Sequence, residues 1–412
     1  MKIGNKLKKQ FVICVVVYVF SLLINLVYAL PDFAVVETNN KKVTTVESSI
    51  QTNAPTFNFK SGAHILMEAS TGKIIYANNE TETLYPASVT KIMTMLLIME
   101  KIDSGALKYT DTVTCTKQAS LMGGSQVWFK EGEVLTIDEA LKCIAVVSAN
   151  DVSYAMAELV GGSHDNFVSM MNDKAKELGM DYTKFMNAHG IDEEGHYTCA
   201  KDIALMSREL ITKHPDILKY TTIWQDSIRN GTFTLSSTNK LLKTYSGLTG
   251  LKTGSTSQAM YNLSATATRE GLTLIAVVMK APSGDIRGQE ITTLLNYGFS
   301  NYSVLEMCKE AEVVDKIKIN KNISEEAEVV TKECKSLLML KGEKREYTKQ
   351  INIKEKLIAP LELNEVIGEV KWIDEEGQIV CKTELVVNKK IGRSKIDEYI
   401  SRILQKFTRF EK

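Results

Sequence analysis

The distribution of apolar residues changes near residue 308, and that change restricts the folds open to the chain. Upstream, short apolar runs alternate with longer ones such as 92–102, which is too long for a typical strand and predicts a buried helix. Downstream, only short apolar runs between polar turns remain, which predicts strands. A chain of 412 residues also exceeds one ordinary hydrophobic core. We therefore expect a mixed body of helices and strands, a small all-β domain and a terminal tail.

The body is expected to open with a strand, a turn and a strand at 63–69, 70–73 and 74–77. Asp138 and Asp202 lie near two helix starts, as capping or first-turn acids. Further helices are predicted at 137–147, 150–160, 164–178, 200–213 and 286–299. Later strands are predicted at 261–267, 272–278, 313–319, 327–330, 336–340, 350–353, 366–373 and 378–387.

The first 29 residues have the composition of a secretory signal peptide. Four lysines precede the apolar run 11–28, which ends at Val27-Tyr28-Ala29 with a small residue at the cleavage position. An uncleaved transmembrane anchor is the alternative, because the run is long for a signal peptide. Either way, the rest of the chain is expected to be exported to the outer face of the membrane. Residues 30–58, rich in polar residues without periodicity, are predicted to be a linker.

The last segment, 393–412, has the spacing of an amphipathic helix. Its apolar residues share one helical face and basic residues occupy the rest, which is typical of a helix that lies in a membrane interface. Packing of this helix on the β domain is the alternative. The apolar face consists of Ile396, Tyr399, Ile400, Ile403, Leu404, Phe407 and Phe410.

Charge and cysteine content exclude several functions. Lysine and arginine balance aspartate and glutamate at 50 each, so nothing indicates a nucleic-acid partner. No HxH or HExxH spacing indicates a metal, and no cofactor motif is present. Six cysteines follow the predicted signal without any CxxC pair, so we prefer free thiols, although pairing in an exported chain stays open. They are Cys115, Cys143, Cys199, Cys308, Cys334 and Cys381.

Three short motifs carry candidate chemistry: Ser88-Val89-Thr90-Lys91, Ser148-Ala149-Asn150 and Lys252-Thr253-Gly254. Ser88 lies where a helix is predicted to begin, so Lys91 shares its face and can reach the hydroxyl. Two rival matches fail on context. Ser70-Thr71-Gly72-Lys73 lies in the predicted hairpin turn, and Ser237-Thr238-Asn239 lies in a polar stretch with no helix around it.

Without an evident catalytic histidine, Lys91 is the candidate base for Ser88. A serine hydroxyl is a poor nucleophile until a base takes its proton. The ordinary lysine pKa of about 10.4 must therefore fall, which burial and the nearby positive charge of Lys252 would both cause. The sequence thus predicts a dry, tightly built site.

The order and spacing of these motifs identify a resemblance. SxxK, an SxN-type element and KTG occur together in penicillin-binding proteins and class A β-lactamases. With Pro86-Ala87 before the first motif, Asn187-Ala188-His189-Gly190, and the downstream β domain and tail, the chain resembles the low-molecular-mass, serine-type D-alanyl-D-alanine carboxypeptidases. The resemblance implies an α+β fold with a penicillin-binding/β-lactamase-like body at 59–306, an all-β domain at 307–392 and a membrane-anchoring helix at 393–412.

The resemblance also implies a catalytic sequence. Ser88 attacks the carbonyl between two D-alanines of a peptidoglycan stem pentapeptide, and Lys91 receives its proton. Ser148 helps to pass that proton to the departing D-alanine, and water then hydrolyses the acyl-enzyme. His189 is expected to hold a loop.

The same resemblance assigns the binding residues. Asn150 is expected to position the substrate amide, and Lys252, Thr253 and Arg287 to face the terminal carboxylate. Backbone N–H groups of Ser88 and Ser255 are expected to form the oxyanion hole. Gly254 is expected to admit the substrate backbone. Ser255 departs from relatives with histidine there, which leaves pH dependence and substrate preference open.

A β-lactamase is the nearest rival function. No glutamate between Ser148 and Lys252 begins the ExxLN element with which class A enzymes deacylate. β-Lactam antibiotics are therefore expected to acylate Ser88 and stay attached. A wall-binding or penicillin-sensing module without turnover is the other alternative, and the complete set of motif residues argues against it.

Overall fold

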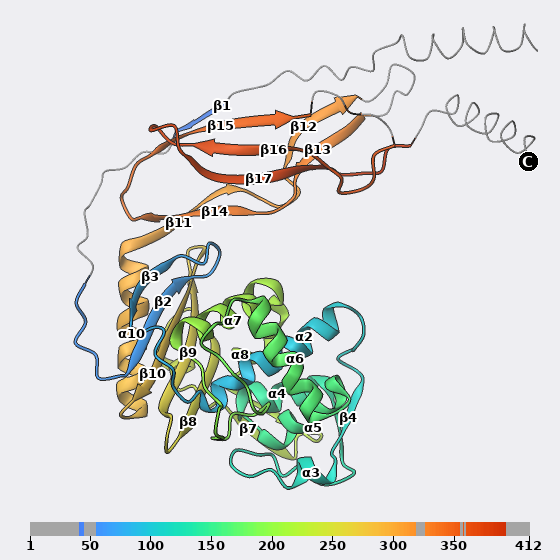
Figure 1. The fold of residues 1–412 in the computed structure, drawn as a ribbon, viewed down its shortest axis with the longest axis vertical. Coiled ribbons are helices and arrows are strands. Elements are labelled where there is room, and N and C mark those ends of the chain that lie inside the picture. Colours follow the sequence, from blue (N-terminus) through green and yellow to red (C-terminus); the bar gives the residue numbers. More distant parts are fainter. Residues whose placement is uncertain (1–40, 45–54, 319–325, 355–356, 358–359, 393–412) are drawn as a thin grey trace, which may run out of the picture. The chain divides into compact units, whose positions relative to one another are not determined.

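The computed structural model describes residues 41–44, 55–318, 326–354, 357 and 360–392. The chain divides into two compact units (Figure 1). The first, called the body, comprises Ser48–Leu305 and Leu338–Glu343. The second, called the β unit, comprises Met1–Glu47, Glu306–Leu337 and Lys344–Lys412.

The body is built on a five-stranded antiparallel sheet in the order β3-β2-β10-β9-β8. The predicted strand, turn and strand at the start of the body are confirmed. The turn is held by the buried Glu68 carboxylate, which accepts the backbone N–H groups of Ser70 and Thr71 at 2.7 Å each. The strands are β2 (Ala63–Glu68), β3 (Ile74–Asn78), β8 (Leu248–Thr256), β9 (Met260–Arg269) and β10 (Leu272–Ala281).

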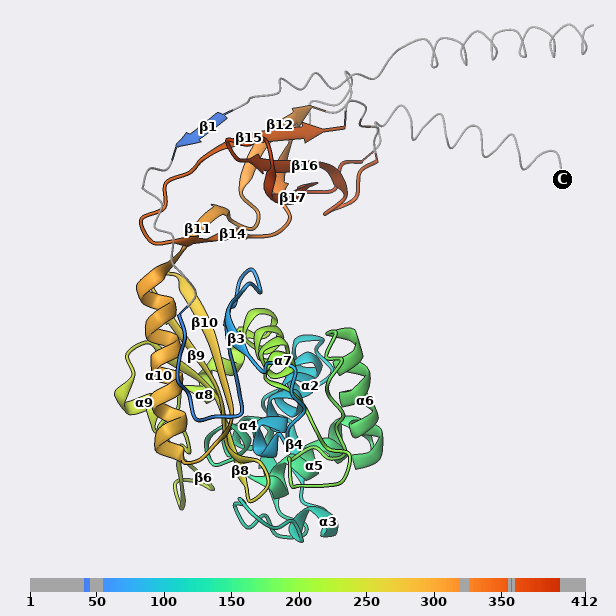
Figure 2. The same ribbon diagram turned by 60° about the vertical axis from the view of Figure 1, so that its left-hand side comes forward.

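Both faces of this sheet are covered (Figure 2). Alternate residues of one strand point to opposite faces, so Leu66 and Leu274 pack in the core with helix α10 (Gly284–Asn301). Their neighbours Ile65 and Ile275 pack in the other core, among the remaining large helices. Continuous apolar strands are the expected result of burial on both faces.

Five helices other than α10 have bounds close to the predicted ones. The acids Asp138 and Asp202 lie in first turns as expected, but the capping side chains are Thr136 and Cys199. Thr136 forms a capping box with Glu139, which satisfies two N–H groups that the helix leaves free. The helices are α2 (Lys91–Asp103), α4 (Ile137–Val146), α5 (Asn150–Gly161), α6 (His164–Glu177) and α7 (Ala200–Lys213).

Several short elements and two longer strands, β8 and β11 (Tyr302–Cys308), escaped the sequence prediction. Strand β8 carries Lys252 and Thr253 at buried positions, so it lacks the apolar alternation that predicts a strand. The short elements are η1 (Ala87–Thr90), β4 (Thr112–Thr114), α3 (Lys117–Ser120), β5 (Val134–Thr136), η2 (Pro215–Ile217), α8 (Leu218–Thr221), β6 (Gln225–Ile228), β7 (Phe233–Ser236) and α9 (Leu241–Thr244).

The six strands predicted after residue 308 are present, and five of them form a six-stranded antiparallel sheet together with β1, in the order β1-β15-β16-β17-β13-β12. Trp372, Val370 and Leu385 are buried in it. β1 (Lys41–Thr44) lies within the predicted linker yet pairs with β15. The other strands are β12 (Val313–Lys318), β13 (Glu326–Thr331), β15 (Glu346–Ile353), β16 (Val366–Ile373) and β17 (Ile379–Val387), and the pair β11 (Tyr302–Cys308) and β14 (Lys335–Leu340) forms a separate ribbon.

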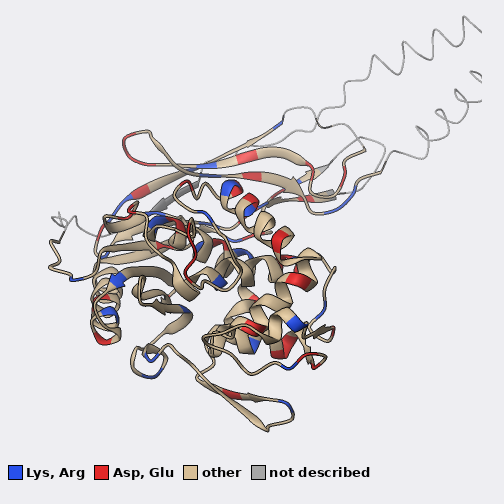
Figure 3. Ribbon diagram, turned by 60° about the horizontal axis from the view of Figure 1, so that its bottom comes forward, with Lys and Arg blue, Asp and Glu red and all other residues tan. Residues whose placement is uncertain are grey.

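The predicted signal segment and amphipathic helix lie outside the described residues. Within the part of the chain that the structure describes, no helix combines the length and apolar character needed to cross a membrane. Basic and acidic residues are intermixed along the described chain (Figure 3).

Two glycines of α10 offer a matched test of this packing. A Cβ at the buried Gly298 would collide with Leu274 and press on Leu66 at 3.1 Å, so Gly298→Ala should lower the free energy of unfolding by about 1–3 kcal/mol. At Gly288 the nearest atom is Leu241 Cδ2 at 3.8 Å. Gly288→Ala should therefore gain about 0.5–1 kcal/mol from helix propensity. Thermal unfolding followed by circular dichroism measures both, and shifts of equal sign would contradict the packing.

Candidate active site

Ser88 and Lys91 lie at the junction of η1 and α2. The 3₁₀ turn carries Ser88, and Lys91 is the first residue of α2. Their spacing places both side chains on one face, with Lys91 Nζ 3.1 Å from Ser88 Oγ. The predicted contact between the Ser88 hydroxyl and the Lys91 amine is thus present.

The Lys91 amine has no access to solvent and three oxygen neighbours. Besides Ser88 Oγ, Nζ donates to Asn150 Oδ1 and to the His189 carbonyl, each at 2.6 Å. Burial is the largest cause that holds the Lys91 pKa well below its ordinary value, the positive charge of Lys252 adds to it, and Asp151 opposes it. Because the Asn150 and His189 oxygens can only accept, each takes an N–H group of the amine, and the third position around Nζ points to Ser88 Oγ.

The Ser148–Asn150 element connects α4 to α5. Ser148 has a backbone φ of 66°, a left-handed conformation that costs about 1 kcal/mol or more in a non-glycine residue. Its side chain is buried, and its Oγ has no hydrogen-bond partner within the described residues. Asn150 begins α5, and its Nδ2 donates to the Gly123 carbonyl at 2.7 Å. The Asn150 amide therefore joins Lys91 to the loop around Gly123.

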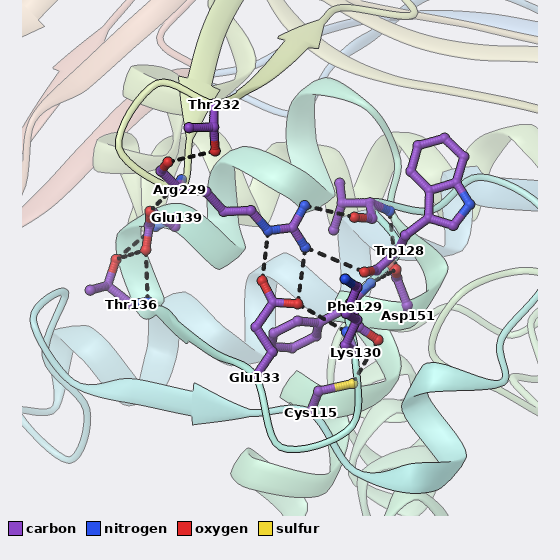
Figure 4. A network of polar contacts seen from close by, with 11 residues as sticks. Cys115, Trp128, Phe129, Lys130, Glu133, Thr136, Glu139, Asp151, Arg229 and Thr232 are labelled. Carbon is purple, nitrogen blue, oxygen red and sulfur yellow. Dashed lines mark hydrogen bonds and ion pairs between the residues drawn. The ribbon is translucent and has the colours of Figure 1, made fainter.

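A polar network fixes the neighbouring loop against α5 (Figure 4). Asp151 Oδ2 accepts the backbone N–H groups of Val127 and Phe129 at 3.0 Å each. Arg229 Nε donates to Glu133 at 2.6 Å, and its Nη1 donates to the Val127 carbonyl at 2.9 Å. Asp151 directly follows Asn150, so this network also fixes the residue that contacts Lys91.

Strand β8 meets η1 backbone to backbone. A Cβ at Gly254 would lie 2.9 Å from the Pro86 carbonyl oxygen and 2.9 Å from the backbone nitrogens of Ser88 and Val89. The glycine is therefore required by the protein's own packing. The expectation that it also makes room for a substrate backbone stays a prediction. Ser255 follows Gly254, exposed and paired with Tyr261 of β9.

Lys252, Thr253 and Arg287 form a cationic region beside this strand. Lys252 is almost completely buried, and its Nζ donates to the Thr253 carbonyl at 3.0 Å. Burial, followed by the charge of Arg287, lowers the Lys252 pKa to about 7. Arg287 Nη1 donates to the Asn262 carbonyl at 3.2 Å, whereas Nε has no partner in the described part of the chain. Two cations in this setting favour an anion such as a carboxylate.

The segment 187–190 supplies a contact that the sequence analysis missed. Asn187 Oδ1 accepts the backbone N–H of Gly190 at 2.7 Å, and the His189 carbonyl faces Lys91. Gly190 has a φ of 88°, and a Cβ there would collide with the Ala87 carbonyl. Burial lowers the His189 pKa to about 3, with Lys91 adding to it, so the ring is neutral and the backbone carbonyl makes the contact.

The two rival motifs have different positions. Ser70 and Lys73 lie in the hairpin turn between β2 and β3, as expected. The other rival lies beside the site, because Thr238 Oγ1 is 2.6 Å from Thr253 Oγ1. Helix α9 follows at residue 241, so our expectation of no helix around this stretch was wrong. Thr238 supports strand β8, and no sequence periodicity pointed to it.

A cavity of about 570 Å³ borders Arg287 on the side of α9 and α10. Thr238, Lys240, Leu263 and Thr292 are among its lining residues. Among the residues described, no group of three or more His, Cys, Asp or Glu side chains is arranged to hold a metal ion.

A serine whose hydroxyl faces a buried lysine, with a KTG strand beside it, defines a serine enzyme of the penicillin-binding class. Residues 48–283 match the family model of D-alanyl-D-alanine carboxypeptidase, and residues 302–393 match that of the penicillin-binding protein 5 C-terminal domain. The chain belongs to the serine-type D-alanyl-D-alanine carboxypeptidases of peptidase family S11, which act in peptidoglycan maturation.

Relatives and solved structures agree with this assignment. The chain is 39% identical to D-alanyl-D-alanine carboxypeptidase DacF of Bacillus subtilis over 84% of its own length and 90% of the relative's. It is 31% identical to DacC of Escherichia coli over 75% and 79%. Penicillin binding protein 5 from Haemophilus influenzae superposes with a TM-score of 0.66 at 26% identity, over 83% of this chain and 100% of that chain.

A shorter solved relative has been seen with an antibiotic. Penicillin-binding protein D2 from Listeria monocytogenes, in its cefotaxime-bound form, superposes with a TM-score of 0.55 at 29% identity, over 60% of this chain and 99% of that chain.

Proposed function

We propose that Ser88 is the nucleophile of this carboxypeptidase and that neutral Lys91 is its base. The observation that carries the proposal is the 3.1 Å contact between Ser88 Oγ and a fully buried Lys91 Nζ close to a second buried cation. Attack on the carbonyl between two D-alanines transfers the hydroxyl proton to Nζ and forms the acyl-enzyme. Water then hydrolyses the ester.

Ser148 is proposed to carry the proton to the departing D-alanine amine. Its Oγ is buried and has no hydrogen-bond partner among the described residues, so it is available to bridge two groups. The strained backbone supports the same role, because left-handed non-glycine residues cluster at active sites.

The remaining groups are proposed to bind the substrate. One N–H of the Asn150 amide donates to Gly123, which leaves the other for a substrate carbonyl. Lys252, Thr253 and Arg287 face the terminal carboxylate, since two partly desolvated cations gain most from an anionic partner. The backbone N–H groups of Ser88 and Ser255 form the oxyanion hole, which the close contact at Gly254 supports.

The same serine is proposed to react with β-lactam antibiotics. The antibiotic-bound form of the Listeria relative supports this, and the missing ExxLN element favours a long-lived adduct. For location, we propose export by residues 1–29 and attachment to the outer face of the membrane through the helix at 393–412, both from sequence composition.

The nucleophile assignment is tested with two serine variants. Ser88→Ala should reduce D-alanine release from a stem pentapeptide by about 1,000-fold or more, without added metal. Ser70→Ala, the serine of the rival motif, should keep full activity. Mass spectrometry after penicillin treatment should locate the adduct on Ser88. Full activity of Ser88→Ala, or an adduct elsewhere, would contradict the assignment.

The Lys252 pKa makes a prediction about pH. Lys252 is charged below about pH 7 and neutral above it, so acylation by penicillin, which carries a carboxylate, should slow as pH rises through this value. Arg287→Gln removes a positive charge that lowers this pKa. The fall in acylation rate at alkaline pH, the alkaline limb of the pH–rate profile, should therefore move to higher pH. Arg208→Gln is the control, because the Arg208 guanidinium donates to the hairpin carbonyls of Ala69 and Ser70. A limb that stays in place in Arg287→Gln would contradict the electrostatic link.

The tail is tested once removal of the signal has been shown by N-terminal sequencing. Phe407→Glu places a charge on the apolar face and should release the protein from the membrane fraction. Gln405→Glu adds the same charge to the polar face and should leave it bound. Unchanged association after deletion of 393–412 would exclude the anchor.

A further inference from the structure

Three cysteines of the β unit take no part in the proposed mechanism. Cys308 ends β11, Cys334 directly precedes β14, and Cys381 lies on β17 opposite Trp372 of β16. Cys308 is only 2% exposed, Cys381 is half-buried and Cys334 is exposed. The cluster therefore contains one thiol that faces solvent and two that lie behind it.

The sulfur of Cys308 lies against the backbone of Cys334. Its thiol donates to the Glu333 carbonyl at 3.6 Å, and the backbone N–H of Lys335 is its other hydrogen-bonding neighbour. These two groups flank Cys334, and standard bond lengths put each within about 3 Å of the Cys334 Cα. The Cys308 sulfur is thus close to that Cα, and rotation of the Cys334 side chain can bring the two sulfurs together. Disulfides need Cα atoms about 4.4–6.8 Å apart.

The charges around the cluster agree with this proximity. Thiolates at Cys381 and, to a smaller extent, at Cys334 raise the pKa of Cys308, and a thiolate at Cys334 raises that of Cys381, so all three sulfurs lie within electrostatic reach. Burial raises the Cys308 pKa to about 11, with Glu312 adding to it. Burial raises the Cys381 pKa, and the Lys335 ammonium, which pairs with Glu333 at 2.6 Å, opposes that rise. The exposed Cys334 is therefore the thiol that meets an oxidant first.

We propose that Cys334 and Cys308 form a disulfide that links the end of β11 to the start of β14. The oxidant is a disulfide compound, either a small molecule or a thiol–disulfide oxidoreductase. The Cys334 thiolate attacks one sulfur of it, which forms a mixed disulfide and releases one thiol. Cys308, after losing its proton to solvent, attacks the Cys334 sulfur and releases the second thiol. Two cysteine thiols are oxidised and one external disulfide is reduced to two thiols.

The cysteines of the body provide an internal control. Cys115 donates to the Phe129 carbonyl at 3.0 Å, and burial raises its pKa to about 11. Cys199 caps α7, and burial raises its pKa to about 12. Cys143 is completely buried, and burial raises its pKa as well. All three should stay reduced under conditions that oxidise the β unit.

The test uses the full chain in detergent, with Cys14→Ser so that six thiols remain. The protein is incubated with oxidised glutathione, free thiols are alkylated, and non-reduced peptides are mapped by mass spectrometry. We expect a peptide pair joined through Cys308 and Cys334, with loss of the mass of two hydrogen atoms. Cys381→Ser should form the same pair to the same extent. Cys334→Ser, at an exposed position where folding is not at risk, should abolish it.

Other outcomes overturn the proposal. A disulfide that joins Cys334 to Cys381, or one that forms in Cys334→Ser, would show that the proposed pairing of Cys308 with Cys334 is wrong. A stable mixed disulfide between glutathione and Cys334 would show that the Cys308 sulfur cannot reach the Cys334 sulfur to displace glutathione. D-Alanine release, measured in parallel, should be the same for Cys334→Ser and the parent chain, so this result is independent of the proposed catalytic roles.

Discussion

The amine of Lys91 is buried, and the surrounding elements of the body must both exclude water from it and provide it with hydrogen-bond partners. Each unit by which its pKa falls corresponds to about 1.4 kcal/mol lost by the charged form. That cost is sustained because α2 is covered on all sides and because the amine has oxygen partners from three separate segments. The loop around Gly123, the start of α5 and the segment 187–190 are each held in place by hydrogen bonds that end near this amine.

The second buried lysine carries a similar cost. Lys252 and Arg287 repel one another. Among the contacts described, Lys252 Nζ has a neutral hydrogen-bonding partner, the Thr253 carbonyl. A site that holds two cations close together without a carboxylate at Lys252 Nζ is less stable than a neutral one of equal packing. An anionic ligand relieves that repulsion, so binding and local stability are coupled.

Sequence patterns predicted the parts of the fold that rest on periodicity. Helix α4 and strand β10 were found because apolar residues recur at the period of their secondary structure. Strand β8 was missed because its buried positions include Lys252 and Thr253, which no apolar pattern marks.

For the site, the contact between Ser88 and Lys91 was predictable because their spacing along one helical turn fixes their separation. The carbonyl of His189 and the hydroxyl of Thr238 were not, since their contacts join segments far apart in the chain. The rival Ser237–Asn239 stretch shows the same limit. Its sequence context suggested irrelevance, yet it supports the KTG strand directly.

The contact at Gly254 has a consequence for how such a protein can change over time. Main chain rests on main chain there, so no side chain determines how far β8 stands from the turn that carries Ser88. Substitutions at neighbouring positions, such as Ser255, can alter the chemistry of the cleft wall without shifting the two backbone segments. Ligand preference is therefore free to diverge among descendants while the reacting geometry is inherited unchanged.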